Sequence, residues 1–179
     1  DALATRLQLA DLLVQQGRGD RAIRIYTQAT ELHPTDVIAW QGLIGAYATA
    51  RDFDRAIAAV RAMPRATYDL ASRNPGFLNA VAAGYSAAGR CGEAENLLTR
   101  SLELDRAAGR AQSPNTQLQL GDIWMRQARY DRAVEAFRAV IGAEPASVDA
   151  WRGYITALHN RNDDRTMLAE SRRIPAPTR

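Results

Sequence analysis

The chain has 179 residues, of which 46% are hydrophobic and 24% charged, and its 23 basic and 20 acidic side chains leave a net charge of only +3. This composition is typical of a folded globular protein of about one domain, and so small a positive charge does not by itself indicate a nucleic-acid partner. No apolar run reaches the roughly 18 residues of a membrane-spanning helix, and the single cysteine, Cys91, excludes an internal disulfide framework and a cysteine-based metal cluster.

Good helix formers dominate the chain. Alanine makes up about a fifth of the residues, and no stretch alternates between apolar and polar with the period of two expected of a strand. The sequence therefore predicts an all-α protein. Periodic apolar positions and end signals predict helices over residues 3–16, 20–32, 36–50, 53–62, 76–88, 91–108, 115–127, 130–142, 147–160 and 163–173.

One segment departs from this alternation of paired helices and short turns. Pro64 ends the helix before it, because proline lacks the amide donor that a helix interior needs. We expect residues 65–74 to form an irregular connection with a short helix at Tyr68–Ser72. Turns between paired helices are expected at Gly17, Gly89 and Gly92.

A pattern of small and large apolar residues recurs along the chain. Ala22, Ala56, Ala94, Ala133 and Met167 occupy matching places, at spacings of 34 to 39 residues. The fourth copy is the most complete and contains Leu120, Gly121, Trp124, Ala133, Phe137 and Pro145. Small residues allow two helix backbones to approach, and the large ones fill the space between neighbouring helices. Each helix is too short to be stable alone, so the pattern predicts stacked helical hairpins.

This pattern resembles the tetratricopeptide repeat, whose signature is W-x2-L-G-x2-Y, then A-x3-F, then P. The resemblance implies a right-handed superhelical solenoid of about five helical hairpins. It places repeats at about 3–36, 37–64, 75–108, 114–147 and 148–179, in a single array interrupted by the connection at 65–74.

A longer period is also visible. Leu7–Leu13 parallels Leu118–Trp124, which begins 111 residues later, and the Met63-Pro64 step parallels Ile174-Pro175 at the same distance. A unit of three hairpins accounts for this spacing. Because the first residue is Asp1 rather than Met, we expect the chain to be a piece of a longer protein, in which a copy of the third repeat follows Pro175.

Tetratricopeptide arrays bind a protein or peptide segment on a concave face lined by the first helix of each hairpin. Transfer of the family's groove positions gives the candidate partner-binding residues Leu7, Asp11, Gln15, Gln41, Thr49, Asn79, Leu118, Asp122, Met125, Arg126, Arg152, Thr156 and His159, and the same positions include Asp149. Asp11 and Asp122 are equivalent positions. Each is either a solvated surface carboxylate or an acceptor for a donor on the partner.

Two other functions have less support from the residues. An RNA-binding helical-repeat protein needs a basic track with stacking aromatic side chains, and the predicted groove has only Arg126 and Arg152. An enzyme needs a catalytic constellation, but His33 and His159 lie far apart, and no Gly-rich phosphate loop is present. We therefore predict neither catalysis nor a cofactor or metal. A non-catalytic regulatory region of a larger enzyme stays an alternative.

A narrower resemblance concerns the proline steps. Met63-Pro64, Ile174-Pro175, Trp40 and Trp151 look similar to the tetratricopeptide region of the bacterial cellulose-synthase-operon protein C family. That resemblance implies a periplasmic array whose partners belong to the polysaccharide-export machinery. Together with the repeats, it predicts a protein–protein interaction scaffold, within an exopolysaccharide (cellulose) synthesis and export complex.

Overall fold

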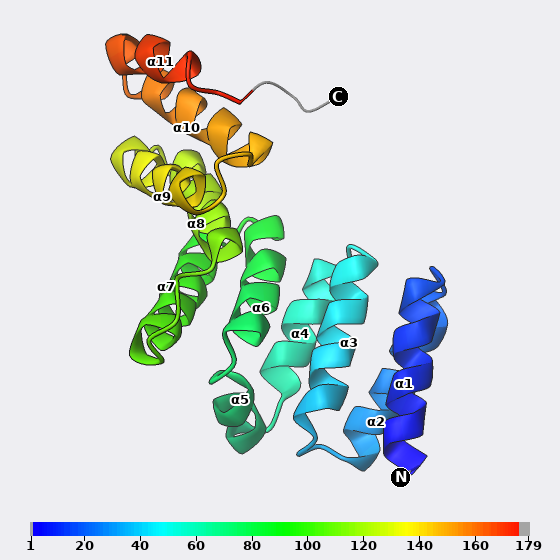
Figure 1. The fold of residues 1–179 in the computed structure, drawn as a ribbon. Coiled ribbons are helices and arrows are strands. Elements are labelled where there is room, and N and C mark those ends of the chain that lie inside the picture. The colour runs from blue at the N-terminus through cyan, green and yellow to red at the C-terminus, as the bar shows by residue number, and fades with distance from the viewer. Residues whose placement is uncertain (1, 176–179) are drawn as a thin grey trace. The chain divides into compact units, whose positions relative to one another are not determined.

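The computed structural model describes residues 2–175, and every regular element in that range is an α-helix (Figure 1). The helices are α1 (Ala2–Gln15), α2 (Gly19–Leu32), α3 (Val37–Thr49), α4 (Phe53–Ala62), α5 (Arg65–Ala71), α6 (Pro75–Ala87), α7 (Cys91–Ala107), α8 (Pro114–Arg126), α9 (Tyr130–Ala143), α10 (Val148–Asn160) and α11 (Asp164–Ser171). The predicted all-α class is confirmed. The chain divides into two compact units, Asp1–Leu104 and Asp105–Arg179.

The first unit is a stack of short helices. Helix α1 packs on α2, α2 on α3, and α3 on α4, while α6 lies against both α3 and α4. Ala10 on α1 and Ala22 on α2 are fully buried, as expected of small residues where two helices touch. The larger members of this core include Tyr26, Trp40, Leu43, Ile44 and Leu78.

Prolines shift the start of two helices from the predicted positions. We expected helices to begin at 76 and 115, but α6 begins at Pro75 and α8 at Pro114. Proline is tolerated in the first helical turn because the amide it lacks would have no intrahelical partner there, and its fixed φ suits the helix. Asn74 caps α6, since its side chain accepts a 2.8 Å hydrogen bond from the Gly76 amide.

The connection after the second hairpin is more helical than predicted. The expected helix at Tyr68–Ser72 begins three residues earlier, at Arg65, and ends at Ala71. Pro64 ends α4 but leaves its own carbonyl available, and the Tyr68 amide donates to that carbonyl at 2.9 Å. The proline therefore separates two helices without a loop between them.

The turn glycines differ in their backbone. Gly17 and Gly89 have φ of +72° and +76°, the left-handed conformation that favours glycine, and both lie in turns as predicted. Gly92 lies inside α7 and is not a turn residue. The turn before α7 instead ends at Arg90, whose amide donates to the Tyr85 carbonyl at 2.8 Å.

The second unit repeats this architecture. Helix α8 packs on α9, α9 on α10, and α10 on α11. Ala133 and Phe137 on α9 and Leu158 on α10 are fully buried, and the rings of Trp151 and Tyr154 meet edge to face with centroids 6.1 Å apart.

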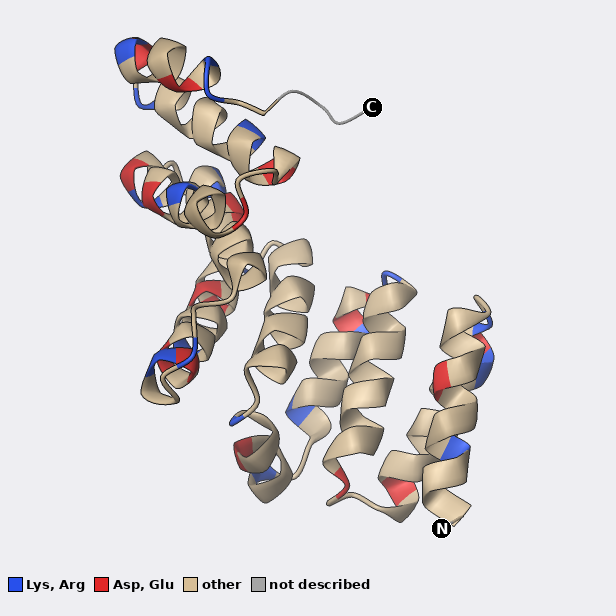
Figure 2. Ribbon diagram, viewed as in Figure 1, with Lys and Arg blue, Asp and Glu red and all other residues tan. Residues whose placement is uncertain are grey.

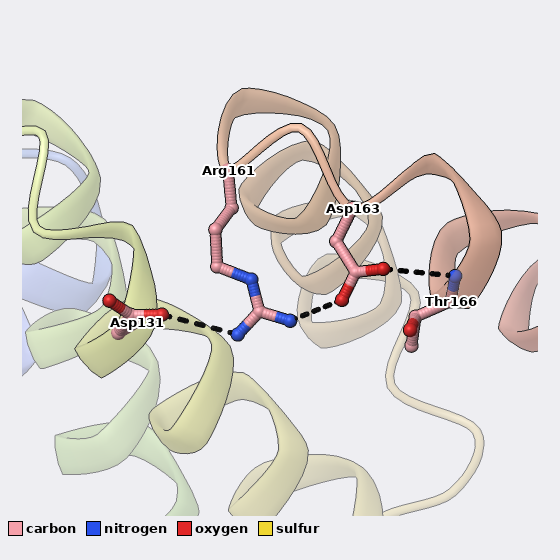
Figure 3. Close-up of polar contacts among 4 residues, drawn as sticks. All are labelled: Asp131, Arg161, Asp163 and Thr166. Carbon is pink, nitrogen blue, oxygen red and sulfur yellow. Dashed lines mark hydrogen bonds and ion pairs between the residues drawn. The ribbon is translucent and has the colours of Figure 1, made fainter.

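An ion-pair cluster joins three elements of this unit (Figure 3). Arg161, which follows α10, donates to Asp131 in the first turn of α9 at 3.2 Å and to Asp163 at 2.5 Å. Asp163 also accepts from the Thr166 amide at 3.2 Å, so it caps α11. The cluster thereby holds the start of α9 and the start of α11 to the same turn.

The 111-residue spacing seen in the sequence recurs in the contacts. In the first unit, the indole nitrogen of Trp40 donates to the Pro34 carbonyl at 2.9 Å. In the second unit, Trp151 donates to the Pro145 carbonyl at 2.8 Å. Both pairs fix the turn before the first helix of a hairpin, so the two units can be compared residue by residue at this spacing.

Candidate partner-binding site

An aromatic ring from the second helix of a hairpin reaches between two first helices. In the first unit this ring is Tyr26 of α2, and it lies so close to Gly42 of α3 that a Cβ atom at position 42 would overlap it. The other end of the ring points to α1, where the Tyr26 hydroxyl donates to Asp11 at 2.5 Å. Glycine at 42 is therefore a packing requirement, because only a residue without a side chain leaves room for the ring.

The second unit uses the same arrangement at the 111-residue spacing, with one change of residue. Phe137 of α9 replaces Tyr26, and Gly153 of α10 replaces Gly42. A Cβ atom at Gly153 would overlap the Phe137 ring, and one at Gly121 of α8 would approach it to 2.6 Å. The ring of Phe137 is fully buried and ends without a hydroxyl group.

This change leaves the two equivalent carboxylates in different surroundings. Asp11 accepts the Tyr26 hydroxyl, and the pKa of Tyr26 is raised, mainly by burial and further by the hydrogen bond and charge of Asp11. Asp122 occupies the matching place on α8 and faces Phe137 across a pocket. The pKa of Asp122 is raised mainly by burial, and the Arg126 guanidinium lowers it less than burial raises it.

The pocket between α8 and α10 has a volume of about 320 Å³. We call it the α8–α10 pocket, and its lining is Leu118, Asp122, Met125, Phe137, Asp149, Arg152, Gly153 and Thr156. Leu118, Met125 and Phe137 supply an apolar wall, and the polar groups come from both helices. One wall therefore suits an aliphatic chain, while the other presents charge.

The charges of the pocket are unevenly balanced. Arg152 lies 3.1 Å from Asp149, and both side chains are largely exposed. Asp122 keeps a surface open to solvent, but the pocket walls withdraw water from its carboxyl, and this burial raises its pKa. The Arg126 guanidinium partly opposes that shift, and the Asp149 carboxylate adds to it. A carboxylate in such a place gains from a cationic or hydrogen-bond-donating ligand.

Of the residues predicted for the groove, those on the first unit have varied positions. Leu7 is only 6% exposed and belongs to the core, so it offers little surface to a partner. Asp11 and Gln15 are exposed, and Gln41 and Asn79 are half-buried. The exposed hydroxyl of Thr49 donates to the Gly45 carbonyl of its own helix at 2.9 Å.

The second unit brings more of the predicted residues together. Leu118, Asp122, Met125, Arg152 and Thr156 all line the α8–α10 pocket. Arg126 and His159 do not belong to its lining. His159 is exposed, with its Nδ1 3.6 Å from an Asp164 oxygen, and the Thr156 hydroxyl donates to the Arg152 carbonyl at 2.8 Å.

Two residues of the pocket were not among the predicted partner-binding set. Phe137 had been assigned to core packing, and Gly153 had no assigned role. A signal for both was present, because Tyr26 and Gly42 lie 111 residues before them. This spacing identifies Phe137 and Gly153 as pocket residues only once the structure shows that the ring passes between two helices.

A family model described as Tetratricopeptide repeat matches residues 7–70 and 118–164, which together are more than half of the chain. The chain belongs to the tetratricopeptide repeat family. The matched segments contain the two corresponding rings, Tyr26 and Phe137, and all of the pocket lining. No curated protein sequence gives a significant match.

Solved structures show the same fold for this tetratricopeptide chain. The crystal structure of the MamA protein matches with a TM-score of 0.83 at 16% identity, over 96% of this chain and 89% of that one. MamA from Desulfovibrio magneticus matches with 0.83 at 13% identity, over 97% and 93%. YrrB, described as a TPR protein with an unusual peptide-binding site, matches with 0.76 at 18% identity, over 94% and 82%. At these identities the likeness concerns the fold alone.

Within residues 2–175, no helix is both long and apolar enough to cross a bilayer. In the same range, no group of three or more His, Cys, Asp or Glu side chains is placed to hold a metal ion.

Proposed function

We propose that this tetratricopeptide chain is a protein-interaction scaffold that holds a segment of a partner protein in the α8–α10 pocket. The observation that carries the proposal is the pocket itself. It combines an apolar wall with Asp122, Asp149 and Arg152 on two adjacent first helices, and six residues at the family's groove positions line it. YrrB, which shares the fold, is described as having a peptide-binding site.

The charge pattern favours a protein partner over a nucleic acid. Helices α3 and α6 carry no charged residue (Figure 2), so the first unit offers no basic track along them. On α8 and α10, Arg126 and Arg152 alternate with Asp122 and Asp149. A phosphate backbone requires an excess of cationic contacts, which this alternation does not supply.

The cellulose-export role has no support beyond the few residues of the sequence resemblance. Neither the family match nor the similar structures described above carry a link to the cellulose-synthase-operon protein or to the periplasm. We therefore restrict the proposal to a scaffold for a protein or peptide partner.

The proposal is tested with a peptide selected on the full chain from a random display library. Its dissociation constant is measured by fluorescence anisotropy for the wild type and for Thr156→Trp, which places a ring in the pocket from an exposed position on α10. Thr99→Trp, at an exposed position on α7, is the matched control. We expect Thr156→Trp to weaken binding by about tenfold or more, the usual effect of blocking a central contact. Equal affinity for all three proteins would refute the proposal.

A further inference from the structure

The two units differ in whether an aromatic hydroxyl group reaches the equivalent carboxylate, Asp11 or Asp122. At Asp11, the Tyr26 hydroxyl occupies an acceptor position of the carboxylate and closes the space between ring and carboxylate. At Asp122, Phe137 supplies no hydroxyl, and a pocket of about 320 Å³ lies between the ring and the carboxylate. The first unit thus shows which group satisfies this carboxylate: a hydrogen-bond donor placed at the end of an apolar body.

We propose that the α8–α10 pocket binds a basic side chain, arginine or lysine, of the partner segment. This inference rests on the proposed function and names the residue type that the pocket selects. Asp122 accepts hydrogen bonds from the cationic head, and the aliphatic stem lies along Leu118 and Met125, above the Phe137 ring. Such side chains commonly place an apolar stem on apolar surface while the head meets a carboxylate.

The electrostatics of the pocket agree with a cation. Asp149 and Asp122 both line it, whereas the one guanidinium of the lining, on Arg152, already lies 3.1 Å from Asp149. Burial raises the pKa of Asp122 and the Arg126 guanidinium offsets that shift only in part, so a cation beside the carboxylate in the pocket would further stabilise its ionised form. An anionic ligand would meet two carboxylates and would bind with repulsion.

The inference is tested with small probes that need no partner. The full chain, labelled with ¹⁵N, is titrated with N-acetyl-arginine N-methylamide and N-acetyl-lysine N-methylamide, and amide shifts are followed by NMR. The citrulline analogue is the matched neutral control, and N-acetyl-glutamate N-methylamide is the anionic one. We expect saturable shifts at Gly153 and Thr156 with at least one basic probe, at an affinity about tenfold or more above that of citrulline. Absence of saturable shifts with both basic probes, or equal binding of citrulline or glutamate, would overturn the inference.

Variants assign the effect to Asp122. Phe137→Tyr adds a hydroxyl group that can donate to Asp122 as the Tyr26 hydroxyl donates to Asp11, and we expect it to weaken binding of the basic probe by about tenfold. Asp122→Asn removes the charge from an exposed position and should weaken it to a similar degree, which keeps the test valid if Phe137→Tyr does not fold. Asp69→Asn, at an exposed position on α5, is the matched control and should leave the shifts at Gly153 unchanged. Unaltered probe affinity in Asp122→Asn would also overturn the inference.

The two proposals fail separately. If library peptides lose affinity in Thr156→Trp yet contain no basic residue, and the basic probes do not bind, the scaffold proposal stands and the basic-side-chain inference falls. If Thr156→Trp has no effect on selected peptides while the arginine probe still binds at Asp122, the pocket binds cations but is not the site for a partner segment.

Discussion

Replacement of Tyr26 by phenylalanine tests whether the ring really joins α2 to the carboxylate on α1. Tyr26 is 2% exposed, so Tyr26→Phe leaves the ring packing in place and removes only the hydroxyl that donates to Asp11. A hydrogen bond to a charged group contributes about 1.5–3 kcal/mol. Asp11 is exposed and is rehydrated when the bond is lost, so we expect a cost below that range, about 1 kcal/mol.

The measurement is urea unfolding followed by circular dichroism at pH 7, for the wild type and for Tyr26→Phe, each with and without Asp11→Ala. A loss of about 1 kcal/mol corresponds to roughly 4–8 °C in the melting temperature of a unit of this size. If the hydrogen bond to Asp11 accounts for the loss, Tyr26→Phe lowers the free energy of unfolding only slightly in the Asp11→Ala background. An equal cost in both backgrounds would refute the reasoning, because the hydroxyl would then act through something other than Asp11.

Gly153→Ala should destabilise the second unit by about 1–3 kcal/mol because the added Cβ overlaps Phe137, and the better helix propensity of alanine should offset about 1 kcal/mol of this cost. Phe137→Leu should relieve the overlap in the Gly153→Ala background, and urea unfolding measures both effects. The pKa of Tyr26 is raised in the folded state, so the unfolded chain loses the hydroxyl proton at a lower pH than the folded chain. Stability should therefore fall as the pH rises above about 10, and the fall should be less steep in Tyr26→Phe; thermal melts at a series of pH values measure this. The Thr166 and Arg161 contacts lower the pKa of Asp163, so their contribution to stability is present at neutral pH and should be lost as the pH falls below about 4. In thermal melts, stability should fall less steeply with acid in Asp163→Asn than in the wild type, and an unchanged acid dependence would contradict this.

Most of the fold followed from local chemistry. Alanines at a regular spacing marked helix contacts, and Ala10, Ala22 and Ala133 are indeed fully buried. Helices α6 and α8 begin one residue earlier than predicted, at Pro75 and Pro114, because the amide that proline lacks has no intrahelical partner in the first turn.

The site was less accessible to sequence reasoning. The family's groove positions identified Asp11 and Asp122 as equivalents, but a pattern of positions does not show what each carboxylate meets. The difference lies at the end of one ring, which carries a hydroxyl group in Tyr26 and only a hydrogen in Phe137. The ring comes near the carboxylate only when the helices pack around a glycine. Likewise, Leu7 occupies a groove position in sequence, yet its side chain turns into the core.

Methyl NMR of the three methionines tests the central claim most directly. Met125 lines the α8–α10 pocket, whereas Met63 is buried in the first unit and Met167 packs on the core of the second. When a library-selected peptide is added to the chain labelled at methionine methyl groups, we expect a saturable shift of the Met125 methyl signal and intermolecular NOEs to it, with the Met63 signal unmoved. A shift of Met63 with Met125 unchanged would contradict the account.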